Sequence, residues 1–303
     1  MVRLVFFGTH EFAATILGGL LDNPLFEVCL VITQPDRPVG RKQELQPSPV
    51  KLLAQKYNIP IEQPAKLTAY SLQLKANIGI VAQYGLLIPK HILDFFPLGI
   101  INVHTSLLPK YRGASPIQSA LINGETETGV TIMKMDQGLD TGPIILQKKA
   151  SIESDETYFH IDKKLAELGI LALNEALPRY ISGELIPVPQ DNAQATICKE
   201  FTRDEGKINW HKTALQIYNQ YRGLTPWPGV WTTWNEKRIK IISMKIIARN
   251  LPPGQVEIFK NQLFVGTTKD AIEVTTIQIE GKTAATTTAF ILGNSSIHGY
   301  VFG

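Results

Sequence analysis

The chain has 303 residues, of which 44% are hydrophobic and 19% are charged, a balance typical of a globular protein with a sizeable buried core. Its two cysteines, Cys29 and Cys198, are too few and too far apart for a disulfide framework, and they favour a reducing cytoplasm. No uncharged stretch is long enough to span a bilayer, and the apolar N-terminus is too short for a signal peptide.

The formal net charge of +3 is unevenly distributed along the chain. Residues 203–303 hold 12 lysines and arginines against 7 acidic residues, whereas residues 1–202 hold 18 against 20. The last third is therefore basic (+5) and the rest is nearly neutral (−2). A basic C-terminal third indicates a polyanionic partner, although a solvated lysine-rich surface has the same composition.

The first part of the chain alternates apolar runs with helical periodicity. A strand at 3–7, a helix at 11–21 and a strand at 26–33 form a β-α-β opening. Further elements are expected as a helix at 48–57, a strand at 59–61, a helix at 68–75 and a buried strand at 78–82. This alternation predicts an α/β domain with a Rossmann-like, mostly parallel sheet.

A polar, proline-rich stretch, residues 34–49, interrupts that alternation. It contains four prolines and three basic residues, Arg37, Arg41 and Lys42. Loops of this length inside a compact domain usually serve a function or are disordered, and a solvated surface loop is the plain alternative.

The strand expected at 100–103 carries the clearest chemical signal. Asn102 and His104 lie two residues apart, so their side chains share one face of the strand near its carboxyl end. Ligands of open α/β sheets bind beyond the carboxyl ends of strands. Alone, the pair favours a structural interpretation, in which an asparagine caps a turn beside a half-buried histidine.

A glycine-rich loop with two carboxylates follows. A helix that begins at Ser115 and a strand at 127–135 precede Asp136 and Asp140, and a strand at 144–148 comes next. Aspartate is common in turns because it forms local hydrogen bonds, so a purely structural loop is the alternative to a functional one.

A change in composition at residues 183–205, after a long amphipathic helix at 157–181, indicates an extended linker. Beyond it, a helix at 213–222 and closely spaced short strands predict a small β-barrel. The strands are expected at 230–235, 238–248, 254–259, 262–267 and 271–279, with a final helix at 283–292. We place a first domain at 1–188, a linker at 189–205 and a second domain at 206–303.

Asn102, His104 and Asp140 together fit acyl transfer to an amine. Such a reaction passes through a tetrahedral oxyanion, which needs hydrogen-bond donors, and it needs a base for the proton that the amine loses. The chain has no G-x-S-x-G nucleophile motif, which favours direct transfer between two bound substrates. It also lacks H-E-x-x-H and C-x-x-C, so no metal is expected.

These residues resemble the catalytic signature of the 10-formyltetrahydrofolate-dependent formyltransferases. The matching segments are Asn102-Val-His104, Ser106-Leu-Leu-Pro109, and Asp140 within Gly-Leu-Asp-Thr-Gly-Pro. Further segments are similar to the branch of that superfamily that formylates methionyl-tRNA. They lie at 33–41, 47–51, 84–89, 111–116, 129–133 and 226–228.

The resemblance implies a Rossmann-like domain followed by an OB-like barrel, and formyl transfer from 10-formyltetrahydrofolate to the α-amino group of methionyl-initiator tRNA. Asn102 and His104 would polarise the formyl carbonyl and hold the oxyanion, and Asp140 would orient His104 and accept a proton through water. The residues implied to bind folate are Gln83, Tyr84, Gly85, Leu86, Leu87, Ser106, Leu107, Leu108 and Pro109. Those implied to bind tRNA are Arg37, Arg41, Lys42, Lys207 and Lys212, with Arg41 at the key basic position.

Two other functions are compatible with parts of this pattern. A formyltransferase that acts on an amino sugar nucleotide or another small amine would keep the three catalytic residues, but it would need neither the 34–49 stretch nor this second domain. A non-catalytic tRNA-binding protein would not need the three residues to converge. We expect a cytoplasmic monomer that uses no metal and no membrane.

Overall fold

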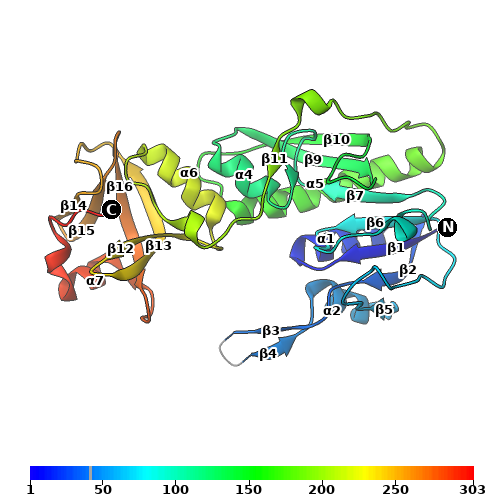
Figure 1. Ribbon diagram of the computed structural model, residues 1–303, viewed down its shortest axis with the longest axis horizontal. Coiled ribbons are helices and arrows are strands. Elements are labelled where there is room, and N and C mark those ends of the chain that lie inside the picture. The colour runs from blue at the N-terminus through cyan, green and yellow to red at the C-terminus, as the bar shows by residue number, and fades with distance from the viewer. Residues whose placement is uncertain (41–42) are drawn as a thin grey trace. The chain divides into compact units, whose positions relative to one another are not determined.

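The computed structural model describes residues 1–40 and 43–303, which form two compact units (Figure 1). The first unit comprises Met1–Pro116, Glu127–Ser151 and His160–Cys198. The second comprises Ile117–Thr126, Ile152–Phe159 and Lys199–Gly303. The finer boundaries expected at residues 188 and 205 stay a prediction.

The first unit is built on a seven-stranded sheet with the order β10-β9-β7-β6-β1-β2-β5. Its strands are β1 (Val2–Gly8), β2 (Phe26–Ile32), β5 (Ile61–Glu62), β6 (Ile78–Ala82), β7 (Ile100–His104), β9 (Glu127–Lys134) and β10 (Ile144–Ser151). Neighbours from β7 to β5 pair in parallel, whereas β9 is antiparallel to both β7 and β10. The predicted mostly parallel α/β sheet is confirmed.

Helices accompany this sheet because its central strands are apolar on both faces. All five residues of β6 are buried, as expected for a parallel strand covered on both sides. The helices of this unit are α1 (Glu11–Leu21), α2 (Pro49–Lys56), α3 (Lys90–Leu93) and, from His160 on, α5 (Tyr158–Ile181). The helix α4 (Pro116–Ile122) belongs to the second unit from Ile117 on. Within the described ranges, no helix is both long and apolar enough to cross a lipid bilayer.

The helix predicted at 68–75 is wrong. Leu72 is buried and Tyr70 and Leu74 pack partly against the same core cluster, while the residues between them are exposed. This two-residue alternation suits an extended chain lying over the core rather than a helix. The strand predicted at 59–61 is also displaced, since β5 begins only at Ile61.

The polar stretch at 34–49 contains a β-hairpin instead of a wholly irregular loop. Its strands, β3 (Arg37–Val39) and β4 (Glu44–Gln46), pair only with each other and extend away from the seven-stranded sheet (Figure 1). All six of these residues are exposed. The candidate residues Arg41 and Lys42 lie outside the described residues.

The second unit is an antiparallel β domain, as predicted. Its six-stranded sheet has the order β12-β13-β16-β15-β14, with β17 beside β16. The strands are β12 (Val230–Trp234), β13 (Lys237–Ile247), β14 (Val256–Phe259), β15 (Gln262–Gly266), β16 (Ala271–Ile279) and β17 (Ala285–Thr286). Single bridges beside β12 (Lys207 to Trp231) and β14 (Gln255 to Val301) cover its two edges.

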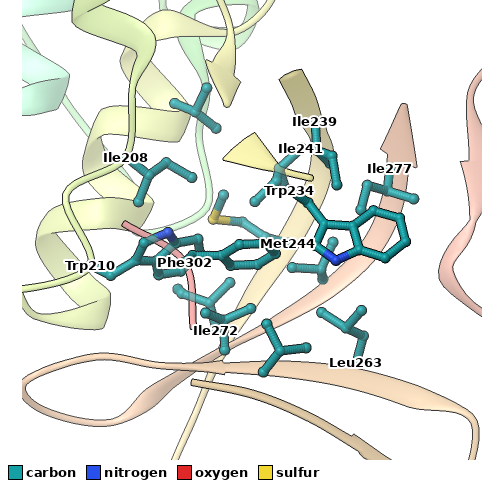
Figure 2. Close-up of a cluster of buried hydrophobic side chains, with 14 of the residues drawn as sticks. Ile208, Trp210, Trp234, Ile239, Ile241, Met244, Leu263, Ile272, Ile277 and Phe302 are labelled. Atoms are coloured by element: carbon teal, nitrogen blue, oxygen red, sulfur yellow. The ribbon is translucent and has the colours of Figure 1, made fainter. Parts of the chain in front are cut away.

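Two aromatic side chains occupy the centre of this second core (Figure 2). Trp210 stacks on Phe302 with ring centroids 5.7 Å apart, and its indole nitrogen donates to Thr232 Oγ1 at 3.2 Å. Branched side chains from β13, β15 and β16 surround them, among them Ile241, Leu263 and Ile272. Phe302, near the end of the chain, is thus part of the core.

Two helices flank this sheet, and both were expected from the sequence. The first, α6 (Ala214–Leu224), begins at a complete capping box between Thr213 and Gln216. The second, α7 (Thr287–Gly293), begins four residues later than predicted, because Ala285 and Thr286 form β17 instead.

The segment interpreted as an extended linker is hydrogen-bonded to the first unit over much of its length. Its residues Ile197–Cys198 (β11) pair in parallel with Arg112–Gly113 (β8). Short 3₁₀ turns lie on either side of β11, at Asn192–Gln194 and Asp204–Gly206. Residues up to Cys198 consequently belong to the first unit.

Candidate active site

The carboxyl ends of β1, β2 and β6 meet where the strand order reverses, which is the usual ligand crevice of an open α/β sheet. Thr9 Oγ1 and Gln34 Nε2 both donate to the carbonyl oxygen of Tyr84, at 3.0 and 2.6 Å. These hydrogen bonds join the ends of the three strands at one edge of the sheet.

His104, at the end of β7, is buried and has an acceptor beside each ring nitrogen. Its Nε2 lies 2.9 Å from the carbonyl oxygen of Tyr111, and its Nδ1 lies 3.6 Å from Oδ2 of Asp140. A carbonyl oxygen only accepts, so Nε2 carries a proton. The Nδ1 distance is that of an ion pair when the ring carries a second proton.

Asp140 lies in the loop between β9 and β10, and its carboxylate connects the site. Oδ2 accepts a hydrogen bond from the backbone N–H of Gly113 at 2.8 Å, and Oδ1 lies 3.4 Å from the side-chain nitrogen of Asn102. The structure therefore brings together Asn102, His104 and Asp140, which are up to 38 residues apart in the chain.

Three non-glycine residues of this edge have left-handed backbones: Gln83 (φ 41°), Tyr111 (φ 59°) and Asp140 (φ 51°). Such conformations are unfavourable for side chains other than glycine and concentrate at functional sites. At the nearby Gly142 the constraint is space: a Cβ atom there would lie 1.9 Å from the carbonyl oxygen of Lys134.

Sequence reasoning missed two polar residues of the site, Arg112 and Gln190. Gln190 Nε2 donates to the carbonyl oxygens of Asp140 and Gly142 at 2.8 and 2.7 Å, and its Oε1 accepts from Arg112. Arg112 is only 5% exposed. Gln190 lies in a polar stretch that was interpreted as a linker, and nothing in that composition distinguishes it from its neighbours.

Two segments are expected to bind folate. The first, residues 106–109, is held in place by the hydroxyl group of Thr131. Its Oγ1 donates to the carbonyl oxygen of Ser106 at 2.6 Å and accepts from the N–H of Leu108 at 3.1 Å. The side chains of Ser106 and Leu108 are buried, and those of Leu107 and Pro109 are partly exposed. The segment thus has a fixed shape beside His104.

The other segment, residues 83–87, divides into a buried and an open part. The ring of Tyr84 is buried in the core below the sheet edge, and its carbonyl oxygen is already bonded to Thr9 and Gln34. Gln83 bonds through its side chain to Asp162. The backbone amides of Gly85, Leu86 and Leu87 form no hydrogen bond among the described residues, and the Leu87 side chain is 79% exposed.

The residues expected to bind tRNA are distributed over both units. Arg37 lies on β3, where its guanidinium donates to the side chain of Gln34. Lys207 and Lys212 are exposed residues of the second unit. In that unit Arg238 also stacks on the ring of Trp231, 3.9 Å from its centroid.

The described residues contain no group of three or more histidine, cysteine, aspartate or glutamate side chains arranged to hold a metal ion.

Comparisons with known proteins agree along the whole chain. Residues 2–177 match the formyl transferase family, and residues 200–295 match the formyl transferase C-terminal domain. The chain is 42% identical over 311 residues to a methionyl-tRNA formyltransferase of Streptococcus sanguinis, with all of both chains covered. It is also 42% identical over 301 residues to that of Caldicellulosiruptor saccharolyticus, with 96% of each covered.

A solved structure has a similar fold. The N-formyltransferase from Helicobacter canadensis, in complex with folinic acid and dTDP-3-aminofucose, superimposes with a TM-score of 0.69 over 90% of this chain and 99% of that chain. Its sequence identity of 23% means that this likeness shows the fold alone.

Proposed function

This chain belongs to the methionyl-tRNA formyltransferase family, and from that premise we propose that Asn102, His104 and Asp140 form its catalytic centre. The enzyme transfers a formyl group from 10-formyltetrahydrofolate to the α-amino group of methionyl-initiator tRNA. The observation that carries the assignment of the centre is the carboxylate of Asp140, which lies 3.6 Å from His104 Nδ1 and 3.4 Å from Asn102 Nδ2.

In the proposed reaction, the amine nitrogen of the methionyl group attacks the formyl carbon, and the carbonyl oxygen becomes an oxyanion. Asn102 stabilises that oxyanion, because only one N–H of its amide faces Asp140 and the other can donate to the developing charge. Asp140 accepts the proton that the amine loses, directly or through a water. The bond from the formyl carbon to N10 of the folate then breaks, and N10 takes up a proton.

His104 has a more constrained role than its type alone suggests. Both ring nitrogens already face acceptors, so His104 can donate to the formyl oxygen only if the Tyr111 or the Asp140 contact is released. We therefore assign oxyanion binding first to Asn102. We propose that His104 orients the carboxylate of Asp140 and balances its negative charge.

For the folate, we propose the open backbone groups at residues 85–87 and the fixed segment at residues 106–109. Backbone N–H and C=O groups that lack protein partners are suited to the donor and acceptor edge of a flat pterin ring. Because the ring of Tyr84 is buried, we propose that this residue supports the segment rather than forming polar contacts with the folate.

For the tRNA, we propose contacts with Arg37, Arg41 and Lys42 of the 34–49 stretch and with Lys207 and Lys212 of the basic second unit. The net charge of +5 over residues 203–303 supports phosphate binding there. We further propose a cytosolic monomer, in keeping with the two free thiols, Cys29 and Cys198, and with the covered sheet edges of the second unit.

The test is formyl transfer from labelled 10-formyltetrahydrofolate to charged initiator and elongator tRNA, with Asp140→Asn beside the wild type. We expect transfer to the initiator alone, and a loss of about 10² to 10⁴ in kcat for the variant while folate still raises its melting temperature. Asp136→Asn is the control, since this exposed carboxylate of the same loop bonds only to loop groups. Near-normal turnover of Asp140→Asn would remove Asp140 from the mechanism.

A further inference from the structure

The side-chain amide nitrogen of Gln190 uses both of its protons at the loop that carries Asp140. Both protons of Nε2 go to loop carbonyl oxygens, those of Asp140 at 2.8 Å and of Gly142 at 2.7 Å. Because an amide nitrogen has two protons and a carbonyl only accepts, the orientation of the amide is determined. Gln190 thus holds the loop at two carbonyl groups, one on each side of Thr141.

Arg112 in turn determines the orientation of Gln190. Its Nε and Nη2 atoms donate to Gln190 Oε1 at 3.0 and 2.8 Å, and Nη2 also donates to Asn192 Oδ1 at 2.8 Å. The guanidinium is buried, and these partners are neutral amides rather than carboxylates. A buried charge held in this way strongly disfavours any rotation of the Gln190 amide.

The backbone around Arg112 touches both catalytic side chains. The carbonyl of Tyr111 accepts from His104, and the N–H of Gly113 donates to Asp140. A single three-residue segment therefore connects the guanidinium to the imidazole and to the carboxylate.

We propose that Gln190, oriented by Arg112, is a positioning residue that holds Asp140 in its left-handed conformation and so fixes its carboxylate between Asn102 and His104. This inference rests on the proposed role of Asp140. A loop residue with φ of 51° relaxes readily unless neighbouring contacts prevent it, and the two Gln190 bonds are those contacts. Small displacements of a catalytic group reduce turnover without preventing substrate binding.

The decisive variant is Gln190→Glu, which keeps the size of the side chain and its contact with Arg112 but places an acceptor against two carbonyl oxygens. We expect kcat to fall about 10- to 100-fold while KM for folate and for tRNA changes little. Gln190→Met, which adds no charge, should likewise lower kcat with little change in KM. This variant tests the proposal if Gln190→Glu does not fold. The control is Gln194→Glu, whose amide bonds only to the exposed Asp191 in the same segment.

A double-mutant cycle with Asp140→Asn separates positioning from a general structural effect. If Gln190 acts through Asp140, changing Gln190 lowers kcat in the wild-type background and has little further effect in Asp140→Asn. An equal loss in both backgrounds, or turnover of Gln190→Glu within twofold of the wild type, would overturn the proposal. Full activity of Asp140→Asn alone would instead show that the proposed catalytic centre is wrong.

Discussion

At the scale of single residues, the site depends on backbone conformations that composition does not reveal. Tyr111 and Asp140 both have left-handed backbones, and through them the carbonyl of Tyr111 and the carboxylate of Asp140 reach His104 from two sides. The residue types Asn, His and Asp could be selected from the sequence because acyl transfer needs donors and a base. Their partners Gln190 and Tyr111 could not be selected in this way, because both bond to or through backbone carbonyl groups whose positions only the folded structure shows.

Tyr84 offers a test of the core beneath the site. Its hydroxyl is buried and has no partner among the described residues, and burial raises the pKa of Tyr84 from 10.0 to about 12. The unfolded chain therefore loses this proton first, so stability is lost as the pH rises from about 10 to about 12. We expect Tyr84→Phe to lack that loss, of about 2–3 kcal/mol, and to match or exceed wild-type stability at neutral pH.

Urea unfolding of both proteins between about pH 8 and 12 measures this difference. The exposed Tyr57, changed to phenylalanine, serves as the control, because its removal should leave the pH dependence unaltered. Parallel stability curves for wild type and Tyr84→Phe would show that the hydroxyl finds solvent or a partner.

At the scale of elements, the hairpin is anchored at its base although its strands are exposed. Lys51 donates to both oxygens of Asp36 at 2.7 and 2.9 Å, and Gln63 donates to Oδ1 at 2.8 Å. These hydrogen bonds hold the pKa of Asp36 below its usual range, so the anchor persists at neutral pH and is lost only in acid. From the other side, Arg37 and Gln34 link the hairpin to Tyr84 at the sheet edge.

Asp36→Asn is expected to weaken the use of tRNA. The variant keeps an oxygen for Gln63 but loses the ion pair with Lys51, so the hairpin is held less firmly, and KM for initiator tRNA should rise about two- to fivefold. The KM for folate should not change. Asp94→Asn, which breaks an exposed pair with Lys90 elsewhere, is the matched control. Equal KM values for tRNA in Asp36→Asn and wild type would show that the Asp36 contacts are not needed for the use of tRNA.

Most elements could be predicted because their apolar spacing and their caps agree. The helix at 213–222 and the five short strands of the second unit follow from such patterns, as does the β-α-β opening. The predictions that failed concern segments that do not bury a continuous apolar face of a helix or strand. Leu72 and Leu74 lie on an extended chain, and the hairpin has no apolar face that periodicity could detect.

At the scale of the whole molecule, the two parts of the chain differ in charge as well as in fold. The last 101 residues carry the net positive charge, whereas the residues of the proposed catalytic centre belong to a part of the chain that is nearly neutral. Binding through phosphates releases counterions and weakens with salt, whereas folate binding through backbone groups depends on salt much less.

We expect log(kcat/KM) for initiator tRNA to fall linearly with the logarithm of salt concentration. Lys207→Ala and Lys212→Ala should each reduce that slope by about one unit if each lysine contacts one phosphate. Lys75→Ala, which removes an exposed lysine of the first unit, should leave the slope unchanged. A slope that neither variant alters would show that neither Lys207 nor Lys212 contacts a phosphate of the tRNA.

The segment from Gln190 to Cys198 has a consequence for how this enzyme can be recombined with its relatives. Its composition is that of a spacer, yet it supplies the amide that bonds to the loop carrying Asp140 and a strand that pairs with β8. A chimera that takes the second unit from another member of the family and joins it at residue 188 would therefore also replace Gln190 and its hydrogen bonds. A junction placed after Cys198 would exchange the second unit and leave the hydrogen bonds to the Asp140 loop unchanged.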